Sequence, residues 1–341
     1  MSDQQQMNVT VMPELHHVEV QRRDIPVPDA DQVIVQVAAV GVCGSDVHFF
    51  HEGRIGDMIV TGPLVLGHES GGTIVAVGSD VDITRIGERV SIEPQRVCRV
   101  CEMCTSGRYN LCPKIEFYAA PPIDGAFAEY VAIQAPFAHP VPDNVSDEAA
   151  ALMEPLSVSI WSAQKAQISP GKRVLIAGAG PIGLVTAQVA RAFGAAEVVV
   201  SDLVEARREQ ALRFGATKVV DPRDGIGEGY DAFIDASGAA PAVQSGIRAL
   251  KPAGIAVLVG MGADEIPLPI SVIQGRELIV TGVFRYANTW PTAIGLVASG
   301  QVDLDSLVTG RFGLEQVHDA LESTTKPGTL KSIVVPSQLR I

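Results

Sequence analysis

Residues 174–188 read Val174-Leu-Ile-Ala-Gly178-Ala-Gly180-Pro-Ile-Gly183-Leu-Val-Thr-Ala-Gln188. An apolar, strand-like run leads into a G-x-G-x-x-G turn, and the turn opens an Ala-rich helical stretch. Gly178 permits the tight turn, Gly180 lets the backbone approach a pyrophosphate, and Gly183 lets the helix pack on the strand. Amide groups at the helix N-terminus are then available to bind the anion. The stretch therefore predicts the first strand, turn and helix of a Rossmann dinucleotide-binding domain.

Asp202 follows the next predicted strand and is placed to accept hydrogen bonds from both hydroxyls of an adenosine ribose. A carboxylate at this point repels a 2′-phosphate, so the sequence favours NAD over NADP. Arg207 and Arg208 complicate this choice, because either side chain can swing toward a 2′-phosphate. The plain structural alternative is that the glycines form only a packing turn and that Asp202 caps the following helix.

From Lys172 onward, apolar strand-like runs alternate with Ala-rich helical stretches. Apolar runs predict strands at Arg173–Ile176, Glu197–Ser201, Lys218–Val220, Ala232–Asp235, Ile255–Val259 and Leu278–Val283. Helical stretches fall between them at Leu184–Phe193, Glu205–Phe214 and Ala242–Leu250. Strands that alternate with helices are typical of a doubly wound parallel sheet, so the predicted fold class is α/β for this part of the chain.

The chain before about Glu154 has a different texture, with short β-rich runs such as Val33–Val37 and Gly72–Val77 broken by Gly and Pro. At 341 residues the chain exceeds the usual size of a single core. We therefore expect a β-rich domain over residues 1–155, a dinucleotide-binding domain over 156–284, and a return of residues 285–341 to the first domain. The returning tail should contain a helix at Trp290–Ser299 and a strand at Lys331–Val335.

Composition narrows the class of partner. A formal charge of −13 disfavours nucleic acid and anionic membranes, both of which require a basic face, and favours a small-molecule substrate. No apolar run approaches a membrane span, and Met1-Ser-Asp-Gln-Gln-Gln6 lacks the basic and apolar parts of a signal peptide. We expect a cytoplasmic protein with reduced cysteines, for which metal binding is a better interpretation than disulfides.

Four of the 5 cysteines form one cluster, Cys98, Cys101, Cys104 and Cys112, with the spacing C-x2-C-x2-C-x7-C. Four thiolates on one short loop suit a closed, tetrahedral structural zinc site. The alternative, a cysteine quartet that holds no zinc, leaves this spacing unexplained.

The remaining cysteine, Cys43, has partners of another kind in His68, Glu69 and Glu154. A thiolate, an imidazole and carboxylates with room for water describe a zinc that takes part in chemistry. A single histidine such as His68 is more often a buried core residue with ordinary hydrogen bonds than a metal ligand. The nearby cysteine and carboxylates favour the metal-ligand interpretation here. Zinc that polarises an alcohol oxygen, together with a nicotinamide that accepts hydride, completes the oxidation of an alcohol to a carbonyl.

At this point the chain resembles a known family, through Val42-Cys-Gly-Ser-Asp-Val-His48, Gly53-Arg-Ile-Gly56, Val65-Leu-Gly-His-Glu69, Met153-Glu-Pro-Leu-Ser-Val158 and Gly282-Val-Phe-Arg-Tyr-Ala-Asn-Thr-Trp-Pro291. These passages resemble the zinc-dependent medium-chain dehydrogenase/reductase superfamily, and within it the polyol branch. The resemblance covers nearly the whole chain. It implies a GroES-like β-rich catalytic domain joined to the Rossmann domain.

The resemblance also implies roles around the catalytic zinc. Cys43, His68 and Glu69 match the zinc ligands, with water or a substrate oxygen as the fourth. Glu154 matches a residue that binds the zinc water and substrate hydroxyls. Ser45 would pass the alkoxide proton through the cofactor ribose to His48. The plain alternatives are that Ser45 only caps a helix and that His48 is a solvated loop residue.

Further matches concern substrate and cofactor. Arg285 and Tyr286 would hold the outer hydroxyls of a polyol, and Phe117 matches a substrate-pocket aromatic. The alternatives are a hinge salt bridge for Arg285, a packing ring for Tyr286 and ordinary core for Phe117. The cofactor contacts implied by the motif and the resemblance are Gly178, Gly180, Ile182, Gly183, Asp202, Arg207, Val259, Gly260, Met261, Val283, Phe284 and Arg285.

Together these matches imply NAD-dependent oxidation of a polyol at C2 to a ketose, by a homotetramer with two zinc ions per subunit. Phe49 departs from the branch, which usually has a tyrosine there, whereas the cysteine quartet is complete. One rival is a zinc-dependent dehydrogenase of threonine or butanediol, which Arg285 and Tyr286 disfavour. The other rival is a non-catalytic NAD-binding sensor, which should have lost metal ligands that this chain keeps.

Overall fold

The structure is a computed structural model that describes residues 5–326 and 328–336. The chain divides into two compact units, one from Met1–Glu154 with Leu304–Ile341 and one from Pro155–Asp303. The return to the first unit therefore begins later than residue 285, where the sequence places it. The amide of Gln188 holds the end of the second unit, because its Oε1 accepts from Asp303 N at 2.8 Å and its Nε2 donates to Asp303 O at 3.0 Å.

The second unit is built on a six-stranded parallel sheet with the order β15-β14-β13-β16-β17-β18. Its strands are β13 (Arg173–Ala177), β14 (Glu197–Ser201), β15 (Lys218–Val220), β16 (Tyr230–Asp235), β17 (Leu250–Leu258) and β18 (Ile279–Gly282). All of the predicted strands are present, so the doubly wound fold is confirmed. Strands β14 and β15 are added on one side of β13, and the chain then crosses to the other side to add β16, β17 and β18. The carboxyl ends of β13 and β16 are the place where such sheets bind ligands.

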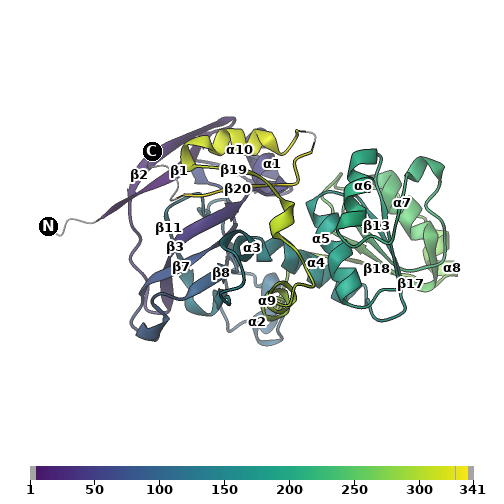
Figure 1. Cartoon of the computed structure of the whole chain (residues 1–341), viewed down its shortest axis with the longest axis horizontal. Coiled ribbons are helices and arrows are strands. Elements are labelled where there is room, and N and C mark those ends of the chain that lie inside the picture. The colour runs from purple at the N-terminus through teal and green to yellow at the C-terminus, as the bar shows by residue number, and fades with distance from the viewer. Residues whose placement is uncertain (1–4, 327, 337–341) are drawn as a thin grey trace. The chain divides into compact units, whose positions relative to one another are not determined.

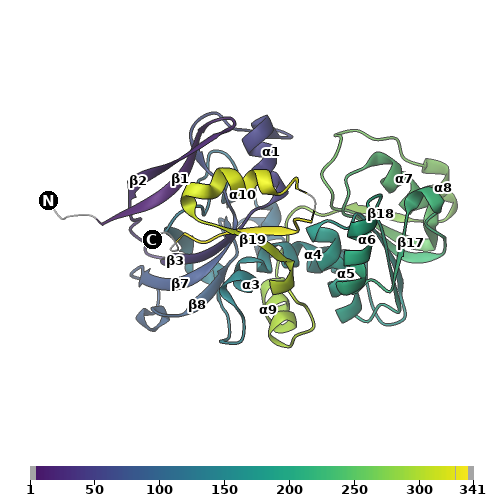
Figure 2. The same ribbon diagram turned by 45° about the horizontal axis from the view of Figure 1, so that its top comes forward.

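Helices cover both faces of this sheet. Helices α5 (Pro181–Ala192) and α6 (Glu205–Arg213) lie on one face and α7 (Ala240–Ala249) on the other (Figures 1 and 2), as right-handed crossovers require. The remaining helices of this unit are α8 (Ile270–Gly275), α9 (Trp290–Ala298) and most of α4 (Met153–Lys165). Helix α5 begins at Pro181 directly after the glycine turn, where a missing amide hydrogen costs nothing.

The first unit is built on a mostly antiparallel seven-stranded sheet with the order β12-β8-β7-β3-β20-β19, in which β11 also pairs with β3. Its strands are β3 (Gln32–Gly41), β7 (Glu69–Val77), β8 (Arg89–Ile92), β11 (Tyr130–Gln134), β12 (Ala138–Pro140), β19 (Val308–Phe312) and β20 (Lys331–Val334). The predicted final strand thus joins the first unit as an antiparallel neighbour of β3. Figures 1 and 2 both show this yellow C-terminal segment among strands from the start of the chain.

Smaller elements surround this sheet. The strands are β1 (Gln6–Glu14), β2 (His17–Asp24), β4 (Arg54–Ile55), β5 (Met58–Ile59), β6 (Leu64–Val65), β9 (Gln95–Arg96) and β10 (Glu116–Phe117). The helices are α1 (Gly44–Glu52), α2 (Glu102–Thr105), α3 (Asp147–Ala151) and α10 (Val317–Ser323). Helix α10 packs against α1, and Phe50 and Phe127 are among the fully buried side chains of the core. Among the described residues, no helix has the length and apolar character needed to cross a membrane.

Candidate active site

Three predicted metal ligands converge in the first unit. Cys43 is the N-cap of α1, His68 directly precedes β7, and Glu69 is the first residue of that strand. One ligand atom from each of the three lies within 4.8 Å of the other two. His68 and Glu69 are buried. A thiolate, an imidazole and a carboxylate at these separations fit a zinc ion with one further coordination position.

Asp46, which sequence reasoning missed, orients this set. Its Oδ1 lies 3.4 Å from His68 Nδ1, and its two oxygens accept from Gly67 N and Cys43 N at 2.9 Å each. Burial opposes the charge of Asp46, but His68 and the two backbone amides outweigh it and hold its pKa below the usual value. A carboxylate on Nδ1 of His68 leaves Nε2 for a metal, as is usual for ligating histidines. The signal in the sequence was the short spacing of Cys43 and Asp46 across the start of a helix.

Lys331 is a second residue that sequence reasoning missed. It is buried, and its ammonium donates to both carboxylate oxygens of Glu69, at 2.6 Å to Oε2, and to Val42 O at 3.0 Å. No local sequence pattern predicts this contact, because 262 positions separate the two residues.

Other predicted residues of the first unit lie near the metal set or on α1. The Phe117 ring centroid is 5.6 Å from that of His68, so this aromatic lies beside a ligand. Glu154 is buried, and its carboxylate does not belong to the mutually close set of three. Ser45 lies within the first turn of α1, and His48 is exposed on the same helix with Nδ1 3.2 Å from Glu52 Oε1.

The cysteine quartet has the geometry of a closed zinc site. Cys98 Sγ lies 3.6 Å from Cys112 Sγ and 3.9 Å from Cys104 Sγ, and Cys101 Sγ lies 3.9 Å from Cys112 Sγ. Four sulfurs at about 2.3 Å from one tetrahedral zinc lie about 3.8 Å from one another. The backbone amides of Val100 and Cys101 lower the pKa of the Cys98 thiol to about 6, whereas burial and hydrogen bonds to the neighbouring thiols raise the pKa of Cys104 to about 12.

In the second unit a cavity of about 500 Å³ opens at the glycine motif. Gly178, Asp202 and Arg207 line it, together with apolar side chains that include Leu203 and Ile226. This composition suits an adenosine half, with an apolar surface for the base and a carboxylate for the ribose.

Asp202 also braces the glycine turn. Its Oδ2 accepts from Ala179 N and its Oδ1 from Val204 N, both at 2.8 Å. Arg208, one of the two cations that complicated the cofactor choice, donates to Asp202 O at 2.7 Å and lies 3.1 Å from Asp221 Oδ2. The guanidinium of Arg208 is therefore engaged, and Arg207 is the cation of this pair that lines the cavity.

The predicted contacts around Val259–Met261 and Val283 follow the carboxyl ends of β17 and β18. Val259 N and Gly260 N both donate to Asp235 O at 2.9 Å. The buried Asp235, which the sequence analysis did not single out, accepts from Ser237 N, Ser237 Oγ and Gly238 N. A Cβ on Gly260 would lie 2.1 Å from Gly238 N, so glycine is required for this close crossing of loops.

The two predicted polyol contacts belong to the second unit. Arg285 has a positive φ of 54°, and its guanidinium lies 4.7 Å above the centroid of the Phe284 ring. Tyr286 is fully buried, with its ring centroid 5.0 Å from that of Trp290 in an edge contact. Tyr286 therefore packs within the core, which is the alternative given for this ring in the sequence analysis.

Comparisons with known proteins agree with this arrangement. Residues 29–143 match the model of the alcohol dehydrogenase GroES-like domain, and residues 181–299 match that of zinc-binding dehydrogenases. Sorbitol dehydrogenase of Bacillus subtilis is 41% identical, over 98% of each chain. D-xylulose reductase A of Aspergillus oryzae is 40% identical, over 95% of each chain. A zinc-binding dehydrogenase of Sinorhizobium meliloti bound to NADP has a TM-score of 0.91 and 31% identity, over 98% of this chain and 100% of that one.

Proposed function

The chain belongs to the zinc-dependent medium-chain dehydrogenase/reductase superfamily, in its polyol branch, and on this premise we propose that it oxidises C2 of a sugar alcohol to a ketose with hydride transfer to NAD. It is an oxidoreductase that uses zinc and a nicotinamide cofactor. The observation that carries the proposal is the convergence of Cys43, His68 and Glu69 in a chain that also has a dinucleotide motif.

Each residue has a role in the proposed mechanism. Cys43, His68 and Glu69 would hold the zinc ion, and Asp46 would keep the imidazole of His68 in the orientation for binding it. Zinc when bound polarises an alcohol oxygen and favours its deprotonation. In the proposed proton path, Ser45 takes up the proton of the substrate hydroxyl, and His48, which is exposed on the same helix, exchanges it with solvent.

Glu154, Arg285, Tyr286 and Phe117 are the proposed substrate contacts. Glu154 is an acceptor for hydroxyls, Arg285 supplies fixed donors, and the Phe117 ring bounds the space beside His68.

The finer points of assembly are proposals as well. We propose two zinc ions per subunit, the second held by the cysteine quartet, and support for this comes from the separations of the sulfur atoms. A homotetramer in the cytoplasm is proposed from the resemblance to the polyol branch. Light scattering of the purified protein tests the tetramer, and microscopy of a tagged chain tests its location.

Xylitol or sorbitol should exceed 2-propanol as substrate in kcat/KM, because Arg285 and Glu154 suit a chain of neighbouring hydroxyls better than one hydroxyl. Arg285→Ala should lower kcat/KM for polyols by about ten- to a hundredfold, the value of a hydrogen bond to a charged group, and spare 2-propanol. NADH formation on a panel of polyols and simple alcohols, with and without chelator, measures both effects.

Arg248→Ala is the matched control for Arg285→Ala, because it removes an exposed cation from α7 in the same unit. A wild-type enzyme that prefers threonine or 2,3-butanediol to every polyol would overturn the substrate assignment and leave the zinc and NAD chemistry intact.

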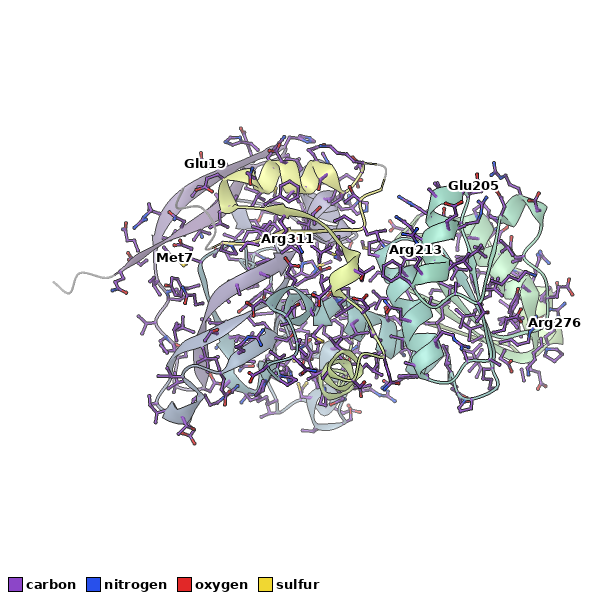
Figure 3. All side chains as sticks on the ribbon, in the orientation of Figure 1. Met7, Glu19, Glu205, Arg213, Arg276 and Arg311 are labelled. Atoms are coloured by element: carbon purple, nitrogen blue, oxygen red, sulfur yellow. The ribbon has the colours of Figure 1, made fainter. Side chains whose placement is uncertain are left out.

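Asp202→Ala should weaken NAD binding by about tenfold or more, since charged hydrogen bonds to the ribose are lost, and should relax the discrimination against NADP. Titration of the reduced forms, NADH and NADPH, by nucleotide fluorescence gives the two affinities. Arg213→Ala serves as the control, because Arg213 is an exposed cation at the far end of α6, opposite Glu205 at its start (Figure 3). A wild-type protein that binds NADP more tightly than NAD would show that Arg207 outweighs Asp202.

A further inference from the structure

Three neighbouring strands of the first unit bring a buried cation to the proposed metal set. Strand β3 lies between β7 and β20, and Gly41 on β3 pairs with Glu69 on one side and Ile333 on the other. The Glu69 side chain reaches across β3 to the ammonium of Lys331 at the start of β20. The contact therefore joins the first strand residue after His68 to the segment that returns from the far end of the chain.

The space for this contact depends on a missing side chain. A Cβ on Gly41 would lie 2.0 Å from Glu69 Oε2 and 3.0 Å from Leu152 Cδ2. No other residue type fits between the carboxylate and Leu152 without displacing Glu69. Gly41 and Lys331 together form a seat for one carboxylate, which we call the Glu69 seat.

The ion pair within the Glu69 seat is shielded from solvent, because the side chain of Lys331 is 5% exposed and that of Glu69 is 1% exposed. Buried ion pairs are costly to desolvate, and well-packed apolar residues often stabilise a core as well or better. Stability of the fold is therefore a poor reason for this pair to exist. The Lys331 nitrogen donates to both oxygens of Glu69 and to Val42 O, and three donors on one nitrogen require the protonated ammonium form.

We propose that Lys331 is a positioning residue for Glu69, which it holds across Gly41 and keeps a weak, displaceable zinc ligand. Two donor contacts from one ammonium draw charge from both carboxylate oxygens. Less negative charge then remains for a metal, and the added positive charge opposes zinc binding. The inference rests on the proposed function, because it requires Glu69 to be a ligand of the catalytic zinc.

The sign of the expected effect separates this role from a structural one. If Lys331 weakens the bond from Glu69 to zinc, Lys331→Met should slow zinc release to a chelator by about tenfold or more. If Lys331 only supports the sheet, the same change should loosen the site and speed release. Lys331→Arg keeps the positive charge but places a larger, planar group in the Glu69 seat, so its release rate should lie closer to wild type than that of Lys331→Met.

The experiment follows zinc release from the full-length, zinc-loaded enzyme into excess chromogenic chelator. Wild type is compared with Lys331→Met, Lys331→Arg, Glu69→Gln and the double variant Lys331→Met/Glu69→Gln. Because Lys331 acts through Glu69, adding Lys331→Met to Glu69→Gln should change the release rate by less than about twofold. Steady-state kinetics should show that Lys331→Met lowers kcat for a polyol more than it changes KM.

Arg311→Met is the matched control. Arg311 lies on β19 of the same returning segment (Figure 3) and makes a two-pronged contact with Glu148, at 2.6 and 2.7 Å, on the surface. Its loss removes a paired cation from the same sheet without touching the metal set, so zinc release should stay at the wild-type rate. Release by the cysteine quartet provides an internal reference in every variant.

Several results would overturn the inference. Faster or unchanged zinc release in Lys331→Met contradicts it, as does an equal slowing in the Glu69→Gln background. If Lys331→Met does not fold, the charge-matched double variant still tests the coupling, since a tenfold difference from Glu69→Gln alone refutes it. A wild-type enzyme that keeps its polyol activity after complete loss of zinc refutes the proposed function itself, whereas normal zinc dependence with unaffected Lys331 variants refutes only this inference.

Discussion

Cys43→Ser is expected to lower polyol oxidation by at least about a thousandfold, because zinc contributes several kcal/mol to stabilising charge in the transition state and a serine hydroxyl does not replace the thiolate. The change is otherwise mild. Serine is nearly the same size and is a favoured N-cap residue, so α1 should keep its start at this position. Initial rates of NADH formation and zinc content by elemental analysis measure the effect.

NAD affinity provides the control for Cys43→Ser. The dinucleotide motif lies in the second unit, outside the one that holds Cys43, so the dissociation constant for NAD should stay within a few-fold of wild type. Thermal stability should also change little, because the cysteine quartet keeps its ligands. Wild-type turnover in a Cys43→Ser enzyme that lacks this zinc would disprove the zinc mechanism.

Cys101→Ser should have the opposite profile. A structural zinc contributes folding free energy directly, so loss of one of its ligands should reduce the free energy of unfolding by on the order of 3 kcal/mol and the Tm by roughly 6–12 °C. Scanning calorimetry measures the stability. Limited proteolysis tests whether the loop from Cys98 to Cys112 opens, since short elements such as α2 hold little structure without the metal.

The cysteine quartet and Cys43 thus predict separable losses, of stability in one variant and of turnover in the other. Below its new Tm, Cys101→Ser should retain most of the wild-type kcat. Elemental analysis that finds one zinc or none in freshly purified wild-type protein would contradict the two-zinc proposal.

Much of the second unit was predictable because its signals are local. The strand before Gly178, the turn and the helix after Gly183 are adjacent in sequence, and each following strand is marked by an apolar run between glycines. The observed strands agree with the predicted ones in order, and β14 and β15 agree at both ends. The return of the tail to the first unit was also predicted, but its start was placed too early because α9 follows β18 without a break in texture.

The neighbours of the metal ligands depended on contacts that leave no local pattern. The spacing of Asp46 from Cys43 is visible in the sequence, but only the fold brings Asp46 to 3.4 Å from His68. Arg208 reads as a free cation, and only the approach of β15 to β14 ties it to Asp221. Tyr286 is predicted as a substrate contact from the sequence, and only the fold shows that its ring also packs against Trp290.

The sequence by itself determined the candidate ligand types and their grouping, namely a cysteine quartet, a mixed set at Cys43, His68 and Glu69, and a dinucleotide motif at Gly178. Short spacings suffice for these, since a loop or a turn places residues that are close along the chain. Only the tertiary structure decided that Lys331 binds Glu69 across Gly41. Strand order within a sheet sets that contact, and strand order depends on the packing of the whole unit rather than on any one stretch of sequence.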